Sequence, residues 1–309
     1  MGIWMKRFLK MTGEAFCMPK KPIRVKNAQN NAKPLERVRL PRSFQPKLAY
    51  LPRPKPQSHK GQNGVLLIIG GGKTYHGAPI LSALAAERFC DLAYFVSTDE
   101  NCDAARKMKF ATPNVIVLPM GKLEWALSRA DCILVGNGME ICGETEGLVR
   151  RVLQSKRKCV LDAAAIRLAE KGKLHEGVIL TPHTGEFKAL FGKAASPKAA
   201  IDASREHGCT VLLKGKTDIV ASCGKALAVH GGNAGMTKGG TGDSLAGLCA
   251  ALYTTCSSPF YAACTASLVN KKAAEMLYRS LGFNYSSKDL AGELAFAAAS
   301  LYRGKKRHR

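Results

Sequence analysis

The chain has 309 residues, of which 46% are hydrophobic and 23% charged, a composition typical of globular proteins and unlike that of disordered or fibrous chains. No apolar run approaches the length of a transmembrane helix, so no membrane association is expected. The net charge is +24, but residues 1–58 carry +12 and residues 303–309 carry +5, which leaves +7 for the stretch between them. A nearly neutral body argues against nucleic acid as the main ligand and leaves only weak contacts of the basic tails with RNA.

The N-terminal segment is predicted to be a basic, flexible arm over residues 1–58. It shows no apolar periodicity, and five prolines lie between residues 41 and 56. Charged residues interrupt its apolar start, so a secretory signal is not expected. Eleven cysteines without any C-x-x-C pair indicate reduced thiols rather than a zinc site or disulfides, and we therefore predict a cytoplasmic protein.

From residue 59 to residue 302, short apolar segments alternate with helical patterns such as Pro79–Cys90 and Glu144–Leu153. This alternation predicts one α/β domain with a mainly parallel central sheet, flanked by helices on both faces, and a basic tail over residues 303–309. The last two strands form an expected hairpin at the sheet edge, and residues 241–302 read as three helices. The expected strands are Val65–Ile69, Ala93–Ser97, Val115–Leu118, Cys132–Val135, Cys159–Leu161, Val178–Leu180, Thr210–Leu213, Ile219–Ala221 and Leu227–Val229.

The loop from Gly70 to Pro79 follows the first strand and leads into a helix, which is where α/β sheets place ligands. Its Gly72-Lys73-Thr74 matches the end of a P-loop, but Leu67 occupies the position of the required first glycine. A dinucleotide fingerprint starting at Gly70 fails as well, because Tyr75 occupies the third glycine position. Neither motif is predicted, but the small residues of this loop still permit close approach of a ligand.

A glycine-rich segment before the first of the three last helices is the strongest functional signal. Five glycines lie between residues 231 and 240, and the helix is expected to begin near Gly242. Glycine lets backbone N–H groups turn toward an anion, and a helix N-terminus adds free N–H donors and a partial positive charge. We predict an anion hole for a transferring phosphoryl group at Gly239, Gly240, Thr241 and Gly242. Asp243, in the first turn, is the candidate base; an isolated acid there more often only complements the helix dipole.

Two further candidate sites follow strands. His183 and Glu186 have H-x-x-E spacing on an emerging helix, where His183 is expected to bind substrate and Glu186 to hold Mg²⁺ through water. The alternative is a helix start that Thr184 caps and in which Glu186 complements the dipole. Lys214 ends an apolar strand, so its ammonium is within reach of a phosphate, and a solvated strand end is the alternative for this residue.

Residues 235–247 read Gly-Met-Thr-Lys-Gly-Gly-Thr-Gly-Asp-Ser-Leu-Ala-Gly, which resembles the signature of the ADP/ATP-dependent NAD(P)H-hydrate dehydratases of the ribokinase-like superfamily. The resemblance extends over residues 59–302. Five other motifs of this family occur in the same order, namely His59-Lys60-Gly61, Gly70–Pro79, Gly136-Asn137-Gly138, Thr181–Glu186 and Lys214–Asp218.

The resemblance implies a ribokinase-like fold and a lyase that returns hydrated NADH and NADPH, (S)-NADHX and NADPHX, to the reduced dinucleotides. In this metabolite-repair reaction the C6 hydroxyl is transiently phosphorylated by ADP or ATP with Mg²⁺, and phosphate then leaves. A separate epimerase chain and a homo-oligomer are implied too. By the same resemblance, Asp243 is the base; the substrate contacts are Ala78, Gly136, Gly138, His183 and Asp243, and the nucleotide contacts are Lys214, Gly215, Lys216, Thr217, Asp218 and Gly242.

Four positions in three motifs depart from the family pattern. Asn137 stands where the family has the proline of Gly-Pro-Gly, Met139-Glu140 replaces Leu-Gly, and Ala164 replaces the second aspartate of Asp-Ala-Asp-Ala. These changes concern metal binding and substrate fit. The alternative function is a ribokinase-like kinase of a vitamin precursor, which would share Asp243 and the anion hole. A kinase leaves a stable phosphorylated product, whereas the dehydratase releases phosphate and a reduced dinucleotide.

Overall fold

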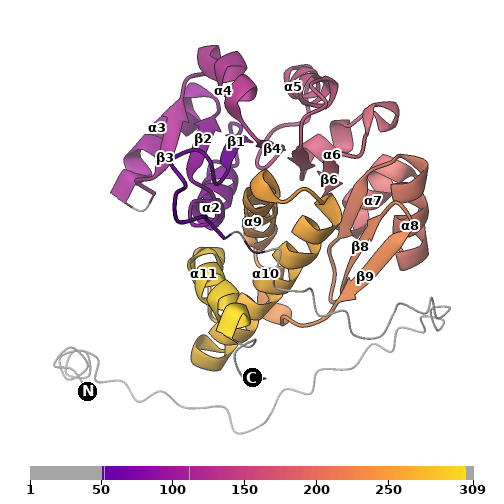
Figure 1. Cartoon of the computed structure of the whole chain (residues 1–309). Coiled ribbons are helices and arrows are strands. Elements are labelled where there is room, and N and C mark those ends of the chain that lie inside the picture. The colour runs from indigo at the N-terminus through magenta and orange to yellow at the C-terminus, as the bar shows by residue number, and fades with distance from the viewer. Residues whose placement is uncertain (1–50, 52, 111, 304–309) are drawn as a thin grey trace, which may run out of the picture. The chain divides into compact units, whose positions relative to one another are not determined.

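The computed structural model describes residues 51, 53–110 and 112–303, so most of the predicted arm and residues 304–309 of the predicted tail lie outside the described residues. One sheet holds nine strands in the order β3-β2-β1-β4-β5-β6-β7-β8-β9. Strands β1 to β7 pair in parallel, and β8 and β9 add an antiparallel edge (Figure 1). The strands are β1 (Val65–Ile69), β2 (Leu92–Val96), β3 (Val115–Leu118), β4 (Cys132–Val135), β5 (Cys159–Leu161), β6 (Val178–Leu180), β7 (Thr210–Leu213), β8 (Asp218–Ser222) and β9 (Lys225–Val229).

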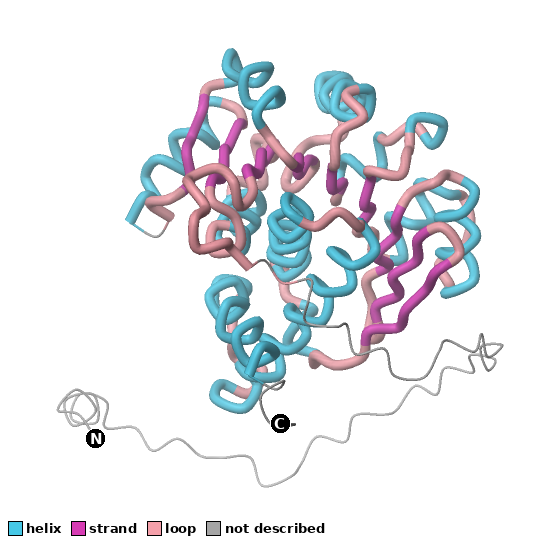
Figure 2. Tube along the Cα trace, in the orientation of Figure 1, coloured by secondary structure: helices cyan, strands magenta, loops and turns pink. Residues whose placement is uncertain are grey.

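Helices cover both faces of this sheet (Figures 1 and 2). Alternate residues of β1 point to opposite layers, because Leu66 and Ile68 pack in one apolar cluster and Leu67 and Ile69 in the other. The first layer contains α2 (Gly77–Ala86), α3 (Asp99–Lys107), α9 (Thr241–Thr255), α10 (Pro259–Leu281) and α11 (Ser287–Arg303). The second contains α4 (Leu123–Arg129), α5 (Gly143–Gln154), α6 (Ala164–Leu168), α7 (Thr184–Phe191) and α8 (Pro197–Glu206). Short 3₁₀ helices span Met108–Phe110, Met120–Lys122, Lys171–Lys173 and Ala234–Thr237.

The structure confirms the predicted α/β architecture. Six of the nine expected strands have the predicted bounds, and the other three differ by one or two residues at an end. Most of the strands were recognisable because they are short, largely apolar and buried, whereas the edge strands β3 and β9 are partly exposed. The expected hairpin is confirmed as β8 and β9, joined by Cys223 and Gly224 at φ of 41° and 85°. Positive φ at both positions matches the tight turn that suits the twist of a hairpin.

Helices α2 and α9 approach each other at backbone distance. A Cβ added to Gly247 would lie 2.2 Å from the backbone oxygen of Ser82, so only glycine fits there without a shift. The Ser82 hydroxyl also donates a hydrogen bond of 3.0 Å to the backbone oxygen of Asp243. The start of α9 is therefore fixed to α2.

The packed part of the chain includes Leu51, which is 3% exposed and belongs to the first apolar cluster. The boundary at residue 58 between arm and domain stays a prediction. Among the described residues, no helix combines the length and apolar content that crossing a bilayer requires.

Candidate active site

The carboxyl ends of the parallel strands bring the predicted motifs together. Strands β1 and β4 are neighbours, whereas β2 and β3 lie on the other side of β1, so the strand order reverses between β1 and β4. Open α/β sheets bind ligands at such a switch point. The backbone N–H of Gly71 donates to the oxygen of Asn137 at 2.7 Å and thereby joins the loops that follow these two strands.

An ion pair between the partly exposed Lys214 and the buried Asp162 lies at the ends of β7 and β5. The Lys214 ammonium donates to Asp162 Oδ1 at 2.8 Å, and the Thr181 hydroxyl donates to the same oxygen at 2.8 Å. Glu186 Oε2 lies 3.8 Å from the same ammonium. Burial works against the charge on Lys214, but the carboxylates of Asp162 and Glu186 outweigh it and hold the pKa of Lys214 above its ordinary value. Lys214 is therefore a fixed positive charge, not the solvated strand end considered as an alternative.

Asp243 joins this network through Asn137. The Asn137 amide nitrogen donates to Asp243 Oδ1 at 2.6 Å and to Asp162 Oδ2 at 2.9 Å. Burial raises the pKa of the Asp243 carboxyl, and the Asp162 carboxylate raises it further, while the Asn137 hydrogen bond and the charge on Lys214 oppose the rise. An acid with a raised pKa is a better proton acceptor once ionised, which suits a general base.

The predicted anion hole lies at the N-terminus of α9. Gly240 caps the helix with φ of 91°, a value that glycine adopts readily. Gly242 already lies inside the helix and does not have a positive φ, so its backbone conformation does not require glycine. A Cβ at this position would lie 3.5 Å from the Lys214 ammonium. The Thr241 hydroxyl donates to the backbone oxygens of Met236 and Lys238, and so fixes the preceding loop.

His183 and Glu186 form a helix cap. His183 Nδ1 accepts hydrogen bonds from the backbone N–H groups of Gly185 and Glu186, and Glu186 Oε2 accepts one from the His183 N–H. The geometry therefore favours a capping interpretation, with His183 in the place expected for Thr184. His183 keeps an exposed ring, whereas Glu186 is buried with both oxygens next to groups of the chain.

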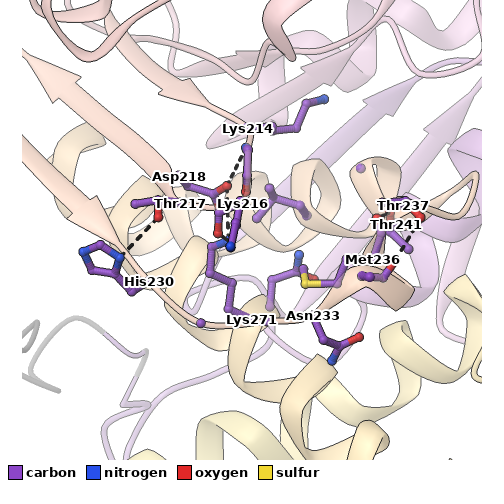
Figure 3. A pocket seen from close by; sticks show the side chains of 17 residues that line it. Lys214, Lys216, Thr217, Asp218, His230, Asn233, Met236, Thr237, Thr241 and Lys271 are labelled. Carbon is purple, nitrogen blue, oxygen red and sulfur yellow. Dashed lines mark hydrogen bonds and ion pairs between the residues drawn. The ribbon is translucent and has the colours of Figure 1, made fainter. Parts of the chain in front are cut away.

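A cavity of about 850 Å³ lies beside the network, between the loop after β7 and the glycine-rich segment. Figure 3 shows Thr217 and His230 at one end of this cavity and Thr237 and Thr241 at the other. A cavity of this size accommodates a nucleotide. The predicted nucleotide contacts all line it, namely Lys214, Gly215, Lys216, Thr217, Asp218 and Gly242.

Asp218 shapes the wall of this cavity from inside the protein. Its Oδ1 accepts a hydrogen bond from the Gly215 N–H and lies 3.4 Å from the Lys271 ammonium, and its Oδ2 accepts one from the Ser267 hydroxyl. Lys271 also donates to the backbone oxygens of Gly215 and Lys216 at 3.2 and 3.1 Å. The loop from Gly215 to Asp218 is thus held by a charge pair that is almost completely buried.

Lys271 and its neighbour Asn270 line the cavity but were not predicted from the sequence. Asn270 is buried, and its Oδ1 has no hydrogen-bond partner among the described residues. A lysine within a helix is ordinarily solvated, which hides its role. The available signal is spacing, since Ser267, Asn270, Lys271 and Ala274 share one helical face and are all buried.

The predicted substrate contacts Ala78 and Gly138 lie together. A Cβ at Gly138 would lie 3.1 Å from the Ala78 Cβ and 2.5 Å from the Tyr75 oxygen, so this approach requires glycine. Gly136 is enclosed differently, because a Cβ there would overlap the Asp162 oxygen and the Ala165 side chain. Its small size therefore serves the packing of β4 against the start of α6.

Comparison with known proteins gives consistent matches. The family model described as NAD(P)H-hydrate dehydratase matches residues 66–295. The ADP-dependent (S)-NAD(P)H-hydrate dehydratase of Nitrosopumilus maritimus is 36% identical over 268 residues, which are 80% of this chain and 92% of that protein. A bifunctional NAD(P)H-hydrate repair enzyme of Hyperthermus butylicus is 36% identical over 269 residues, which are 79% of this chain and 50% of that protein.

A solved structure shows the same fold. The ADP/ATP-dependent NAD(P)H-hydrate dehydratase of Bacillus subtilis, co-crystallized with ATP/Mg²⁺, superposes with a TM-score of 0.72 at 22% identity. The match covers 82% of this chain and 95% of that one. The predicted fold is therefore confirmed.

Proposed function

This chain belongs to the NAD(P)H-hydrate dehydratase family, and from that premise we propose that it dehydrates hydrated NADH and NADPH with ADP or ATP as phosphoryl donor. The observation that carries the proposal is the position of Asp243. Asp243 lies in the first turn of α9, directly after Thr241 and Gly242, which line the nucleotide-sized cavity together with Lys214. A base, an anion site and a phosphate-binding cation thus meet at one point.

The reaction begins with phosphoryl transfer. Asp243 accepts the proton of the C6 hydroxyl as the hydroxyl oxygen attacks the terminal phosphorus of the nucleotide. The N–H groups at the start of α9 and the Lys214 ammonium stabilise the charge that develops on the transferring group. The ammonium can do so because the carboxylates of Asp162 and Glu186 favour its protonated, charged form.

Elimination follows within the same site. Hydroxide is a poor leaving group, and its conversion to a phosphate ester provides a good one. The lone pair on the ring nitrogen next to C6 expels inorganic phosphate, and loss of a proton from C5 restores the double bond. Ala78 and Gly138, which lie against each other at the end of β4, are the proposed contacts of the hydrated ring together with Gly136 and His183.

Mg²⁺ fits this site as a companion of the nucleotide. No group of three or more acidic, histidine or cysteine side chains among the described residues forms a metal cluster. Mg²⁺ bound to nucleotide phosphates needs only one or two protein carboxylates and retains several waters. Glu186, whose oxygens already have partners in the chain, is the proposed contact through water. The ion would neutralise phosphate charge during transfer.

The protein's setting is part of the proposal. We place the enzyme in the cytoplasm as a homo-oligomer, and a separate chain would supply the epimerase that interconverts the two hydrate epimers. The bifunctional relative from Hyperthermus butylicus, of which this chain spans half, supports a second repair activity as a functional partner. Weak contact of nucleic acid with the basic tails stays a prediction.

The test is incubation of the full-length chain with hydrated NADH and either ADP or ATP. We expect the absorbance of the reduced nicotinamide ring to return and inorganic phosphate to appear in equal amount. A stable phosphorylated product without NADH would instead identify a kinase. Omission of nucleotide is the control, since spontaneous loss of water would continue without it.

A further inference from the structure

Asn137 occupies a fixed place between the two halves of the site. It is fully buried, and Gly136 and Gly138 flank it with φ of 117° and 71°. Its backbone oxygen accepts the hydrogen bond from Gly71. The loop conformation thus holds the Asn137 side chain in one direction.

The direction of the amide follows from its neighbours. Both protons of the amide nitrogen are used, one on Asp243 Oδ1 and one on Asp162 Oδ2. The reverse orientation would place a carbonyl oxygen against two carboxylates. The amide oxygen has no partner among the described residues, so the side chain gives up one hydrogen bond in order to keep the two charge-assisted ones.

We infer that Asn137 is a positioning residue for the reaction: its amide fixes the Asp243 carboxylate against the Asp162–Lys214 pair and leaves the second oxygen of Asp243 to accept the substrate proton. This inference rests on the proposed function, in which Asp243 is the base. The anchor is firm, because Asp162 is held in turn by Lys214, directly after β7, and by Thr181, directly after β6.

The same amide separates two like charges. Asp162 and Lys214 are the charged groups that act on Asp243, and Glu186 lies behind Lys214. Without the amide, burial and the repulsion from Asp162 are opposed less, chiefly by the charge on Lys214, so the pKa of Asp243 would rise further. A neutral hydrogen-bond donor at this position therefore both orients the Asp243 carboxylate and favours its ionised form.

The expected effects are specific to turnover. For Asn137→Ala we expect kcat to fall roughly 10- to 100-fold, the scale of a misplaced reacting group. The acidic limb of the pH dependence of kcat should move to higher pH. The KM for ATP and the nucleotide Kd should change less than about threefold, since Asn137 is not among the residues that line the nucleotide cavity. Asn137→Asp should lose more, because it adds a third carboxylate. Asn137→Ser, which keeps one donor, should fall between wild type and Asn137→Ala.

The experiment is steady-state kinetics over a pH series with the full-length chain, hydrated NADH and ATP. Thr210→Val is the control for a lost buried hydrogen bond, since Thr210 bonds Ser222 at the opposite end of β7; it should leave the pH profile unchanged. An Asn137→Ala profile that coincides with that of the control would overturn the inference, as would Asn137→Ser no better than Asn137→Ala. If Asp243→Asn itself stays active, the base assignment fails instead. Should Asn137→Ala fail to fold, Asn137→Ser provides the test: a shift of the acidic limb of its kcat profile to higher pH would support the inference, and an unshifted limb would overturn it.

Discussion

Lys271→Met is expected to destabilise the protein strongly by leaving Asp218 as an unpaired charge. The two side chains are 4% and 6% exposed, so water cannot replace the lost partner. Removing one member of a buried ion pair costs about 3–5 kcal/mol, against a typical total stability of roughly 5–15 kcal/mol. The substitution also removes the two hydrogen bonds from Lys271 to the backbone oxygens of Gly215 and Lys216, so this part of the wall of the nucleotide cavity should become less ordered.

The assay is urea unfolding of the nucleotide-free protein, with nucleotide Kd measured below the transition. Lys272→Met is a matched control in the next position, since its pair with Glu275 is partly exposed and should contribute less than about 1 kcal/mol. Lys271→Met/Asp218→Asn removes both charges, keeps an acceptor for Gly215 and should recover a large part of the loss. Equal stability of Lys271→Met and Lys272→Met, or a double variant no more stable than Lys271→Met, would refute the reasoning.

Three further outcomes are expected. Asp243→Asn should lower kcat about 10²–10⁴-fold and retain nucleotide affinity. Because folding raises the pKa of Asp243, the ionised carboxylate destabilises the folded protein at neutral pH, so the same variant should have a higher thermal midpoint there by calorimetry. This gain should disappear as the pH falls through the raised pKa toward the ordinary value of 3.8. Gly242→Val should lower kcat about 10²–10³-fold and change KM much less, because its side chain would lie next to Lys214 at the N-terminus of α9. A normal kcat in steady-state assays would show that phosphoryl transfer takes place elsewhere. Deletion of residues 1–45 removes a net charge of +9 but spares buried Leu51, so retention on heparin should fall while activity persists, and an insoluble product would contradict this.

The fold was largely predictable because most of its strands are short, buried and separated by helices. Such strands need no knowledge of their partners to be recognised, as the agreement for Cys132–Val135 and Cys159–Leu161 shows. The strand order was not predicted, since pairing depends on contacts between distant segments. The glycine-rich start of α9 was predictable for the same local reason, because five glycines just before a helix indicate a backbone that turns sharply and approaches a ligand closely.

The polar network was less predictable, because its members are joined only in space. Asn137 stood out only as a departure from a family pattern, and nothing local indicates that its amide reaches Asp162 and Asp243, which are 25 and 106 positions away. Lys271 likewise reads as a solvated helical lysine until α10 is seen against the loop after β7. The helix cap formed by His183 Nδ1 was not predicted either, and the expected contact of this residue with substrate stays a prediction.

Gly247 has a consequence for how mutational data on this protein are read. The residue is not among those that line the nucleotide cavity, yet any side chain there pushes α9 away from Ser82 and carries Asp243 with it. A saturation screen scored by activity would therefore rank Gly247 beside Asp243, the proposed base. A parallel screen scored by protein abundance would separate the two positions, since only variants of Gly247 should lose abundance as well as activity. The same backbone contact restricts how the site can evolve, because a new substrate has to be accommodated by exchange of loop residues and not by displacement of the two helices.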